Sequence, residues 1–234
     1  VGWGLGIRAA AFAAMLVTAA AFPLAVARSR ESGMAEGQAQ LVRSGVLLLA
    51  VLAPAAGGLW AISDPLVERM VAAPFREMTA AVLPWAILAG AARNLRIHFG
   101  EQVFLLREET KIPLANDAFD GLSTIAGGAI GLAMGGLPGS VAGAACGATA
   151  SLLVTLSCGA YLHGFALPAG HVVRIATATA AMIGALHFLP MAPTVFSLAL
   201  AIATGGTVYA LALVALYPFD VGIVLSKFRA LRQA

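Results

Sequence analysis

Long apolar runs are the feature of this sequence that most limits its fold. Seven stretches of about 20 residues recur along the chain with few or no charges. A membrane-spanning α-helix needs about 20 apolar residues, because it must cross a hydrocarbon core of about 30 Å. A transmembrane β-strand is about half as long and alternates apolar with polar residues, which these runs do not. The sequence therefore predicts an all-α, polytopic transmembrane bundle of about seven spanning helices.

The expected spans cover residues 5–26, 41–62, 78–107, 114–137, 140–162, 172–189 and 195–216. Pro54 lies inside the second span, and membrane helices tolerate such a residue where neighbouring groups satisfy the freed carbonyl. In the fourth and fifth spans glycine recurs at every fourth position, which predicts close helix contact. The glycines of this pattern are Gly127, Gly131, Gly135, Gly139, Gly143 and Gly147.

Composition supports a membrane protein. Of the 234 residues 60% are hydrophobic and 11% charged, and the mean hydropathy is +0.91. A soluble domain carries about 25% charged residues. We expect one helical lobe over residues 1–218, followed by a basic cytoplasmic tail over 219–234. The start at Val1, without methionine, indicates a piece of a longer protein.

The distribution of lysine and arginine predicts the orientation. If the tail is cytoplasmic, the loops on that side carry most of the cations, whereas the opposite loops hold Arg69 and Arg76 beside acidic residues. Cytoplasmic loops of membrane proteins are enriched in lysine and arginine. The N-terminus is therefore expected outside and the C-terminus in the cytoplasm. The basic pI of about 9.2 reflects this asymmetry and does not indicate a nucleic-acid partner.

The third span contains the strongest candidates for function. Residues 78–92 carry no charge and extend only about 22 Å as a helix, so the polar residues that follow must lie at or near membrane depth. On a helical wheel one side of this span is polar, and we expect it to face a cavity. Its residues are Arg93, Asn94, His98 and Glu101. The alternative is that Arg93 and Arg96 extend to lipid headgroups at the end of a long helix.

Two aspartates could indicate an enzyme. Asp117, Asp120 and Gly121 form DxxDG, which resembles the start of the metal-binding motif of CDP-alcohol phosphotransferases. The two further aspartates of that motif are absent, since no carboxylate follows before Asp220. The simpler interpretation is that Asp117 and Asp120 occupy the N-terminal turns of the fourth helix, where negative charge is favourable. No catalytic residue and no metal site are predicted, and Cys146 and Cys158 are expected to be free, buried residues.

Three segments together resemble a known family. They are AAFPLAVARSRE at residues 20–31, VLLLAVLAPAAGGLWAISDPLVERMVAAPF at 46–75 and LPGSVAGAA at 137–145. The succession is similar to the C-terminal half of the multidrug, oligosaccharidyl-lipid and polysaccharide exporter superfamily. Within it, the chain looks most like the flippases of lipid-linked polysaccharide precursors, including O-antigen flippases.

The resemblance implies a transporter of the bacterial inner membrane, not an enzyme, with no cofactor. It would move a polyprenyl-diphosphate-linked saccharide by alternating access, with cationic side chains lining the cavity. Arg8 and Arg93 are the expected cations, although Arg8 is alternatively an interfacial residue. Expected partners are the lipid-linked saccharide, membrane lipids and an N-terminal lobe of the same protein. The alternatives are a drug/cation antiporter of the same superfamily, a magnesium-dependent phosphotransferase using Asp117 and Asp120, and a membrane scaffold.

Overall fold

The computed structural model describes residues 20–217, and every regular element in this range is a helix. The all-α class is confirmed for this part of the chain. Four helices, α3, α7, α8 and α9, are long and apolar enough to span a membrane. The predicted tail and most of the first predicted span lie outside the described residues. The elements are α2 (Ala21–Ser32), α3 (Met34–Ala61), α4 (Ser63–Met70), a 3-10 turn η1 (Ala73–Phe75), α5 (Arg76–Leu95), a π-helix η2 (Arg96–Gly100), α6 (Gln102–Leu106), α7 (Lys111–His163), α8 (Ala169–His187) and α9 (Val195–Leu216).

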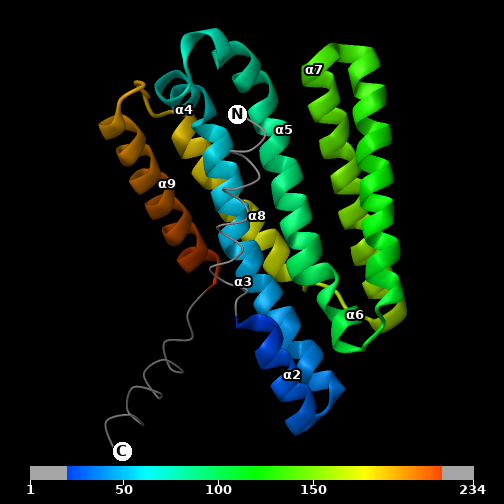
Figure 1. Ribbon diagram of the computed structural model, residues 1–234. Coiled ribbons are helices and arrows are strands. Elements are labelled where there is room, and N and C mark those ends of the chain that lie inside the picture. The colour runs from blue at the N-terminus through cyan, green and yellow to red at the C-terminus, as the bar shows by residue number, and fades with distance from the viewer. Residues whose placement is uncertain (1–19, 218–234) are drawn as a thin grey trace, which may run out of the picture.

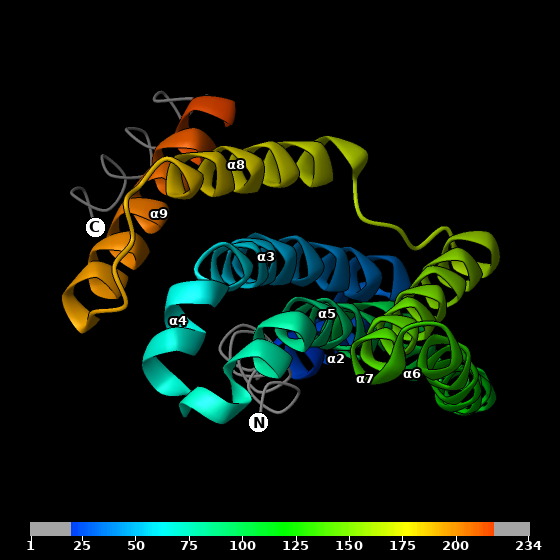
Figure 2. The ribbon, with the colours of Figure 1, turned by 90° about the horizontal axis from the view of Figure 1, so that it is seen from above.

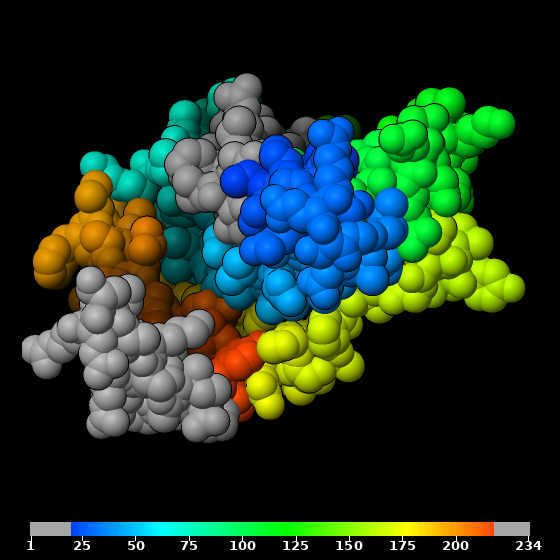
Figure 3. Space-filling view, turned by 90° about the horizontal axis from the view of Figure 1, so that it is seen from below, coloured from blue at the N-terminus to red at the C-terminus, as the bar shows by residue number. Residues whose placement is uncertain are grey.

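Helix α3 lies at the centre of the bundle (Figure 1). It packs against α2 and α5 on one side and against α8 and α9 on the other (Figure 2). Helix α7 packs against α5 and forms one flank, while α9 forms the opposite flank. Seen from the end where α2 lies, α2 and the start of α3 cover the middle of the molecule (Figure 3). Helix α3 therefore connects the two flanks.

Aromatic side chains form the core near the lower end of α3. The rings of Phe99 and Phe165 stack with their centroids 4.5 Å apart, and Phe104 is buried in the same cluster. Elsewhere large apolar side chains remain exposed, such as Met134 on α7 and Phe196 on α9. Lipid tails are as apolar as these side chains, so their exposure is expected on the outer face of a membrane protein.

Helix α7 folds back on itself. Its backbone leaves the helical conformation at Gly135 and Gly136, and Gly136 has a φ of 61°, which favours glycine. The two arms, residues 111–134 and 137–163, run antiparallel (Figure 1). The predicted spans, 114–137 and 140–162, leave the turn between them at Pro138 and Gly139. Pro138 instead lies in the first turn of the second arm, where proline is compatible with a helix.

Glycines hold the two arms of α7 together. A Cβ atom on Gly127 or Gly143 would collide with the backbone of the other, and the same is true of Gly131 and Gly139. The same holds for Gly147 against the Ser123 carbonyl, so the prediction of close contact is confirmed for five of the six glycines. Gly135 is the exception, because it lies in the turn between the arms. Small residues allow helix backbones to approach closely, which increases their van der Waals contact.

The third predicted span is not one continuous α-helix. Helix α5 ends at Leu95, and the Glu101 N–H donates to the Arg96 carbonyl at 2.9 Å, the i→i+5 bond of a π-helix. The wider turn brings Glu101 back beside Arg96, while Val103 and Phe104 stay in the apolar core. The expectation of one span over 78–107 with a constant α-helical rotation is therefore wrong, because the π-helix at Arg96–Gly100 shifts the register of the residues that follow.

Candidate functional site

Two arginines join α5 and the π-helix to the first arm of α7. Arg93 Nε lies 3.2 Å from Asp120 Oδ2, and Arg93 Nη2 donates to Thr124 Oγ1 at 2.8 Å. Arg96 Nη2 lies 2.9 Å from Asp117 Oδ1, and Arg96 Nη1 pairs with Glu101 Oε1. We call Arg93, Arg96, Glu101, Asp117 and Asp120 the ion-pair cluster.

The spacing of these residues explains why they meet. Arg93 and Arg96 are three residues apart, as are Asp117 and Asp120, so each pair lies on one face of its helix. Arg93 contacts the later aspartate and Arg96 the earlier one, which is the order that antiparallel helices require.

The cluster is mostly withdrawn from solvent. Arg96 is 3% exposed and Glu101 is 6% exposed, whereas the side chain of Asp117 is 60% exposed. Asp120 lies nine residues after Lys111, the start of α7, or about 14 Å along the helix. If this arm spans the membrane, the cluster lies at membrane depth. Buried charges at such a depth are costly unless they are paired.

The pairing within the cluster is uneven. Asp120 Oδ2 lies 3.2 Å from Arg93 Nε and 3.9 Å from Arg96 Nη2, so one carboxylate oxygen is within reach of both arginines. Among the described residues, Arg96 Nε and Asp120 Oδ1 are buried without a hydrogen-bond partner. Two arginines face three carboxylates, which gives a formal net charge of minus one when all five groups are ionised. The carboxylates of the cluster therefore outnumber its arginines by one.

The structure brings two of the five predicted site residues into the cluster. Arg93 and Glu101 both belong to it, although they are not paired with each other. The Asn94 amide donates to the Gly90 carbonyl of its own helix at 2.8 Å, and His98 is half-buried in the π-helix. Arg8 lies outside the described residues. That these side chains line a cavity stays a prediction.

Three members of the cluster were not predicted as site residues. Arg96 is buried and paired, so the alternative of a side chain extending to headgroups is wrong for it. Because α7 begins at Lys111, Asp117 and Asp120 lie in its second and third turns and do not cap it. The signal that could have found them is an acidic pair in an apolar helix whose spacing matches that of two arginines.

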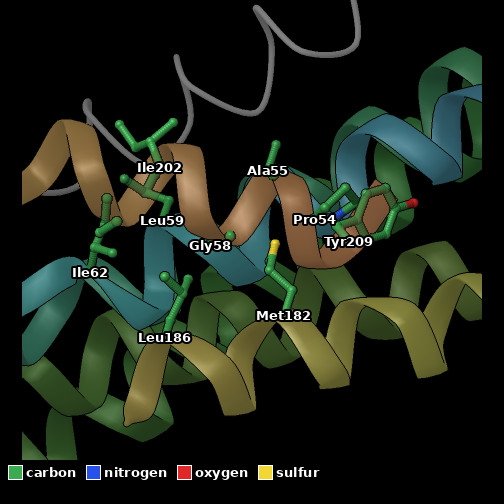
Figure 4. A pocket seen from close by; sticks show the side chains of 12 residues that line it. Pro54, Ala55, Gly58, Leu59, Ile62, Met182, Leu186, Ile202 and Tyr209 are labelled. Atoms are coloured by element: carbon green, nitrogen blue, oxygen red, sulfur yellow. The ribbon is translucent and has the colours of Figure 1, made fainter. Parts of the chain in front are cut away.

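A separate groove lies between α3, α8 and α9 and has a volume of about 420 Å³ (Figure 4). Its lining contains no charged residue, and Tyr209 supplies its one hydroxyl. Apolar side chains such as Leu59, Met182 and Ile202 surround it. The groove can take an apolar group, but it is not a cation-lined cavity.

The predicted aspartate and cysteine environments can be compared with the structure within residues 20–217. No group of three or more histidine, cysteine, aspartate or glutamate side chains is placed to hold a metal ion in this range. Asp117 and Asp120 are instead bound by arginines. Both cysteines are free, as predicted, but Cys146 is exposed and Cys158 half-buried, so the prediction that they are buried is wrong.

Comparisons with family models, with curated proteins and with solved structures gave no match for this chain.

Proposed function

We propose that this chain is part of a transporter that flips a polyprenyl-diphosphate-linked saccharide across the bacterial inner membrane by alternating access. In this proposal the chain contributes seven spans, with its N-terminus outside and its C-terminus in the cytoplasm. An N-terminal lobe of the same protein completes the substrate cavity. Support comes from the family resemblance of the three segments and from the ion-pair cluster.

The observation that carries the proposal is a pair of arginines held by carboxylates of a facing helix. They would lie at membrane depth if the first arm of α7 spans the bilayer. A diphosphate offers oxygen acceptors that match the planar donors of arginine and can bind them in pairs. Asp117 is the most exposed member of the cluster, and it occupies Arg96 Nη2. A diphosphate that displaced Asp117 would gain access to a donor that is otherwise covered.

Displacement of the carboxylates also offers a route to conformational change. Asp117 and Asp120 belong to α7, while both arginines belong to α5 and the π-helix. When a diphosphate takes over the arginines, the ion pairs between these elements are lost. The first arm of α7 is then free to adopt a second packing against α5. Packed interfaces of this kind switch between discrete arrangements, and a ligand shifts them by binding one arrangement more tightly.

A second candidate is a drug/cation antiporter of the same superfamily. The observation that favours it is the excess of one carboxylate in the cluster. In such a transporter a cation would compete with the arginines for Asp117 and Asp120. In the flippase the arginines of the cluster bind the substrate, whereas in the antiporter Asp117 and Asp120 bind it.

Binding of farnesyl diphosphate, a short isoprenyl diphosphate, to the complete protein in nanodiscs tests the proposal. Arg93→Gln and Arg96→Lys should each weaken binding about tenfold, because each removes charge-assisted hydrogen bonds. Arg43→Gln on α3 removes an exposed arginine outside the cluster and serves as the matched control. Asp117→Asn should strengthen binding, since it replaces the carboxylate that competes with the diphosphate for Arg96 by a neutral amide.

The opposite pattern would contradict the flippase. If Arg93→Gln and Arg96→Lys bind farnesyl diphosphate as the unaltered protein does, the cluster does not hold the diphosphate. If Asp117→Asn and Asp120→Asn also abolish uptake of a cationic dye into proteoliposomes, the antiporter becomes the better account.

A further inference from the structure

Four side chains join the two free ends of the α7 hairpin to each other and to α3. His163 is the last residue of α7, and its Nε2 lies 2.9 Å from Oε2 of Glu109, just before the first arm begins. Gln38 of α3 donates to the His163 carbonyl at 2.8 Å and accepts from Arg107 Nη2 at 3.2 Å. We call Gln38, Arg107, Glu109 and His163 the His163 network. It lies at the lower end of the bundle, where α6 meets α7 (Figure 1).

The connection between α6 and α7, residues 107–110, contains a backbone conformation that must be held in place. Glu108 has a φ of 60°, in the left-handed region, which is unfavourable for a residue with a side chain. Such conformations persist only where their surroundings hold them. The N–H groups of Glu108 and Glu109 supply part of this by donating to carbonyls of α6. Arg107 and Glu109, on either side of Glu108, supply the rest through the His163 network.

The His163 imidazole faces one charged group. Its side chain is 10% exposed, and the ring of Phe104 on α6 lies edge-on to it with the centroids 5.6 Å apart. Helix α6 carries no charge, and within residues 20–217 the carboxylate that pairs with the imidazole is that of Glu109. Arg107 reaches His163 only through the neutral side chain of Gln38. A proton on the imidazole therefore meets an anion at contact distance.

The other elements that pack against α7 direct their charges elsewhere. These elements are α5 and the π-helix, and their arginines Arg93 and Arg96 are bound in the ion-pair cluster. His98 of the π-helix belongs to no ion pair in the part of the chain that the structure describes. The charged residues nearest to the network in the sequence are exposed, so solvent and salt screen them. They are Glu36, Glu108 and Lys111.

We propose that His163 is a pH-sensitive fastening of the connection between α6 and α7. An imidazole takes up a proton within the physiological pH range. When His163 does so, its hydrogen bond to Glu109 becomes an ion pair between two full charges, and the connection is held more tightly. In the predicted orientation this end of the bundle faces the cytoplasm, so the fastening responds to cytoplasmic pH. It does not depend on which solute the protein carries and therefore goes beyond the proposed function.

A spin label on the connection tests this proposal. Thr110 is exposed and makes no capping hydrogen bond, so Thr110→Cys offers a labelling position that disturbs no contact. The label is attached to the complete protein in nanodiscs, with Cys146 and Cys158 replaced. Its electron paramagnetic resonance spectrum gives the ratio of mobile to immobile label. The ratio is measured at about pH 5.5 and about pH 8, on either side of the imidazole titration.

Three variants carry the same label. His163→Gln keeps a side-chain amide that can donate to Glu109 but cannot take up a proton in this range. Glu109→Gln removes the carboxylate and leaves the imidazole, and its side chain is 37% exposed, so the fold tolerates the change. His187→Gln is the matched control, because His187 is an exposed histidine at the other end of α8.

We expect the mobile-to-immobile ratio of the unaltered protein to rise about two- to fivefold from the acidic to the alkaline sample, as the loss of a partly exposed ion pair requires. His163→Gln and Glu109→Gln should each give a ratio that does not change with pH, and His187→Gln should behave as the unaltered protein does. A ratio that is independent of pH in the unaltered protein would overturn the proposal. A pH effect that survives in His163→Gln or in Glu109→Gln would overturn it as well.

Discussion

At the residue scale, Arg96 organises the ion-pair cluster. It is 3% exposed, and it contacts Glu101 of its own segment and Asp117 of α7. A buried ion pair adds little stability over a well-packed apolar pair, but breaking one leaves a charge that has lost both water and partner. Removal of Arg96 alone should therefore cost much more stability than removal of Arg96 together with its buried partner Glu101.

Replacing Arg96 tests this arrangement. Arg96→Met leaves Glu101 buried without its partner and should lower the free energy of unfolding by roughly 3–5 kcal/mol. The double variant Arg96→Met, Glu101→Gln should recover most of the loss, because the isolated charge is gone. Denaturant titration in mixed micelles measures both values.

Arg43→Met is the control for this prediction, because Arg43 is exposed on α3 and its loss should change stability by no more than about 0.5 kcal/mol. If Arg96→Met unfolds at the same denaturant concentration as the unaltered protein, Arg96 is not a buried, paired charge.

At the element scale, the close approach of the two α7 arms depends on particular glycines. A Cβ on Gly131 would collide with the carbonyl of Gly139 in the facing arm, and backbone atoms cannot turn aside as a flexible side chain can. Gly121 lies in the same arm, but a Cβ there meets nothing within 4 Å. These two glycines form a matched pair.

Gly131→Ala should destabilise the protein by about 1–3 kcal/mol, because the arms must separate. Gly121→Ala should be neutral or stabilising by up to about 1 kcal/mol, since alanine is the better helix former. Denaturation of the two variants side by side measures the difference. Equal stability of the two variants would show that the arms do not touch at Gly131.

The positions of the helices could be predicted from the sequence in part. The apolar run at 195–216 coincides with α9, since a run of this length and hydropathy is itself the signal of a membrane helix. The prediction for the third span was wrong because it assumed a constant rotation of about 100° per residue. The π-helix at Arg96–Gly100 changes the register, so the partner of Glu101 is Arg96. The contacts of Arg93 and Arg96 with α7 could not be predicted from the sequence either. These contacts join two helices, and no local sequence pattern specifies how those helices pack.

At the scale of the whole molecule, the proposed transporter has a definite orientation in the membrane. The loop around α4 and the loop between α6 and α7 lie at opposite ends of the bundle (Figure 1). Single cysteines at exposed Glu68 and exposed Thr110, with Cys146 and Cys158 replaced, can therefore report the two sides. The distribution of lysine and arginine predicts that a membrane-impermeant thiol reagent labels position 68 from outside and position 110 from the cytoplasm. Labelling of position 68 from the cytoplasm and of position 110 from outside would show that the orientation is opposite to the predicted one.

In the proposed transporter, the ion-pair cluster rearranges when a polyprenyl diphosphate binds. Thr124→Cys places a thiol beside Arg93, and Ile130→Cys places a control thiol two turns away on the exposed face of the same arm. We would measure labelling of each, in the complete protein without Cys146 and Cys158, with and without added lipid-linked saccharide. The account predicts that the substrate changes the labelling rate at position 124 severalfold and leaves position 130 unchanged. An identical rate at position 124 with saturating substrate would contradict it.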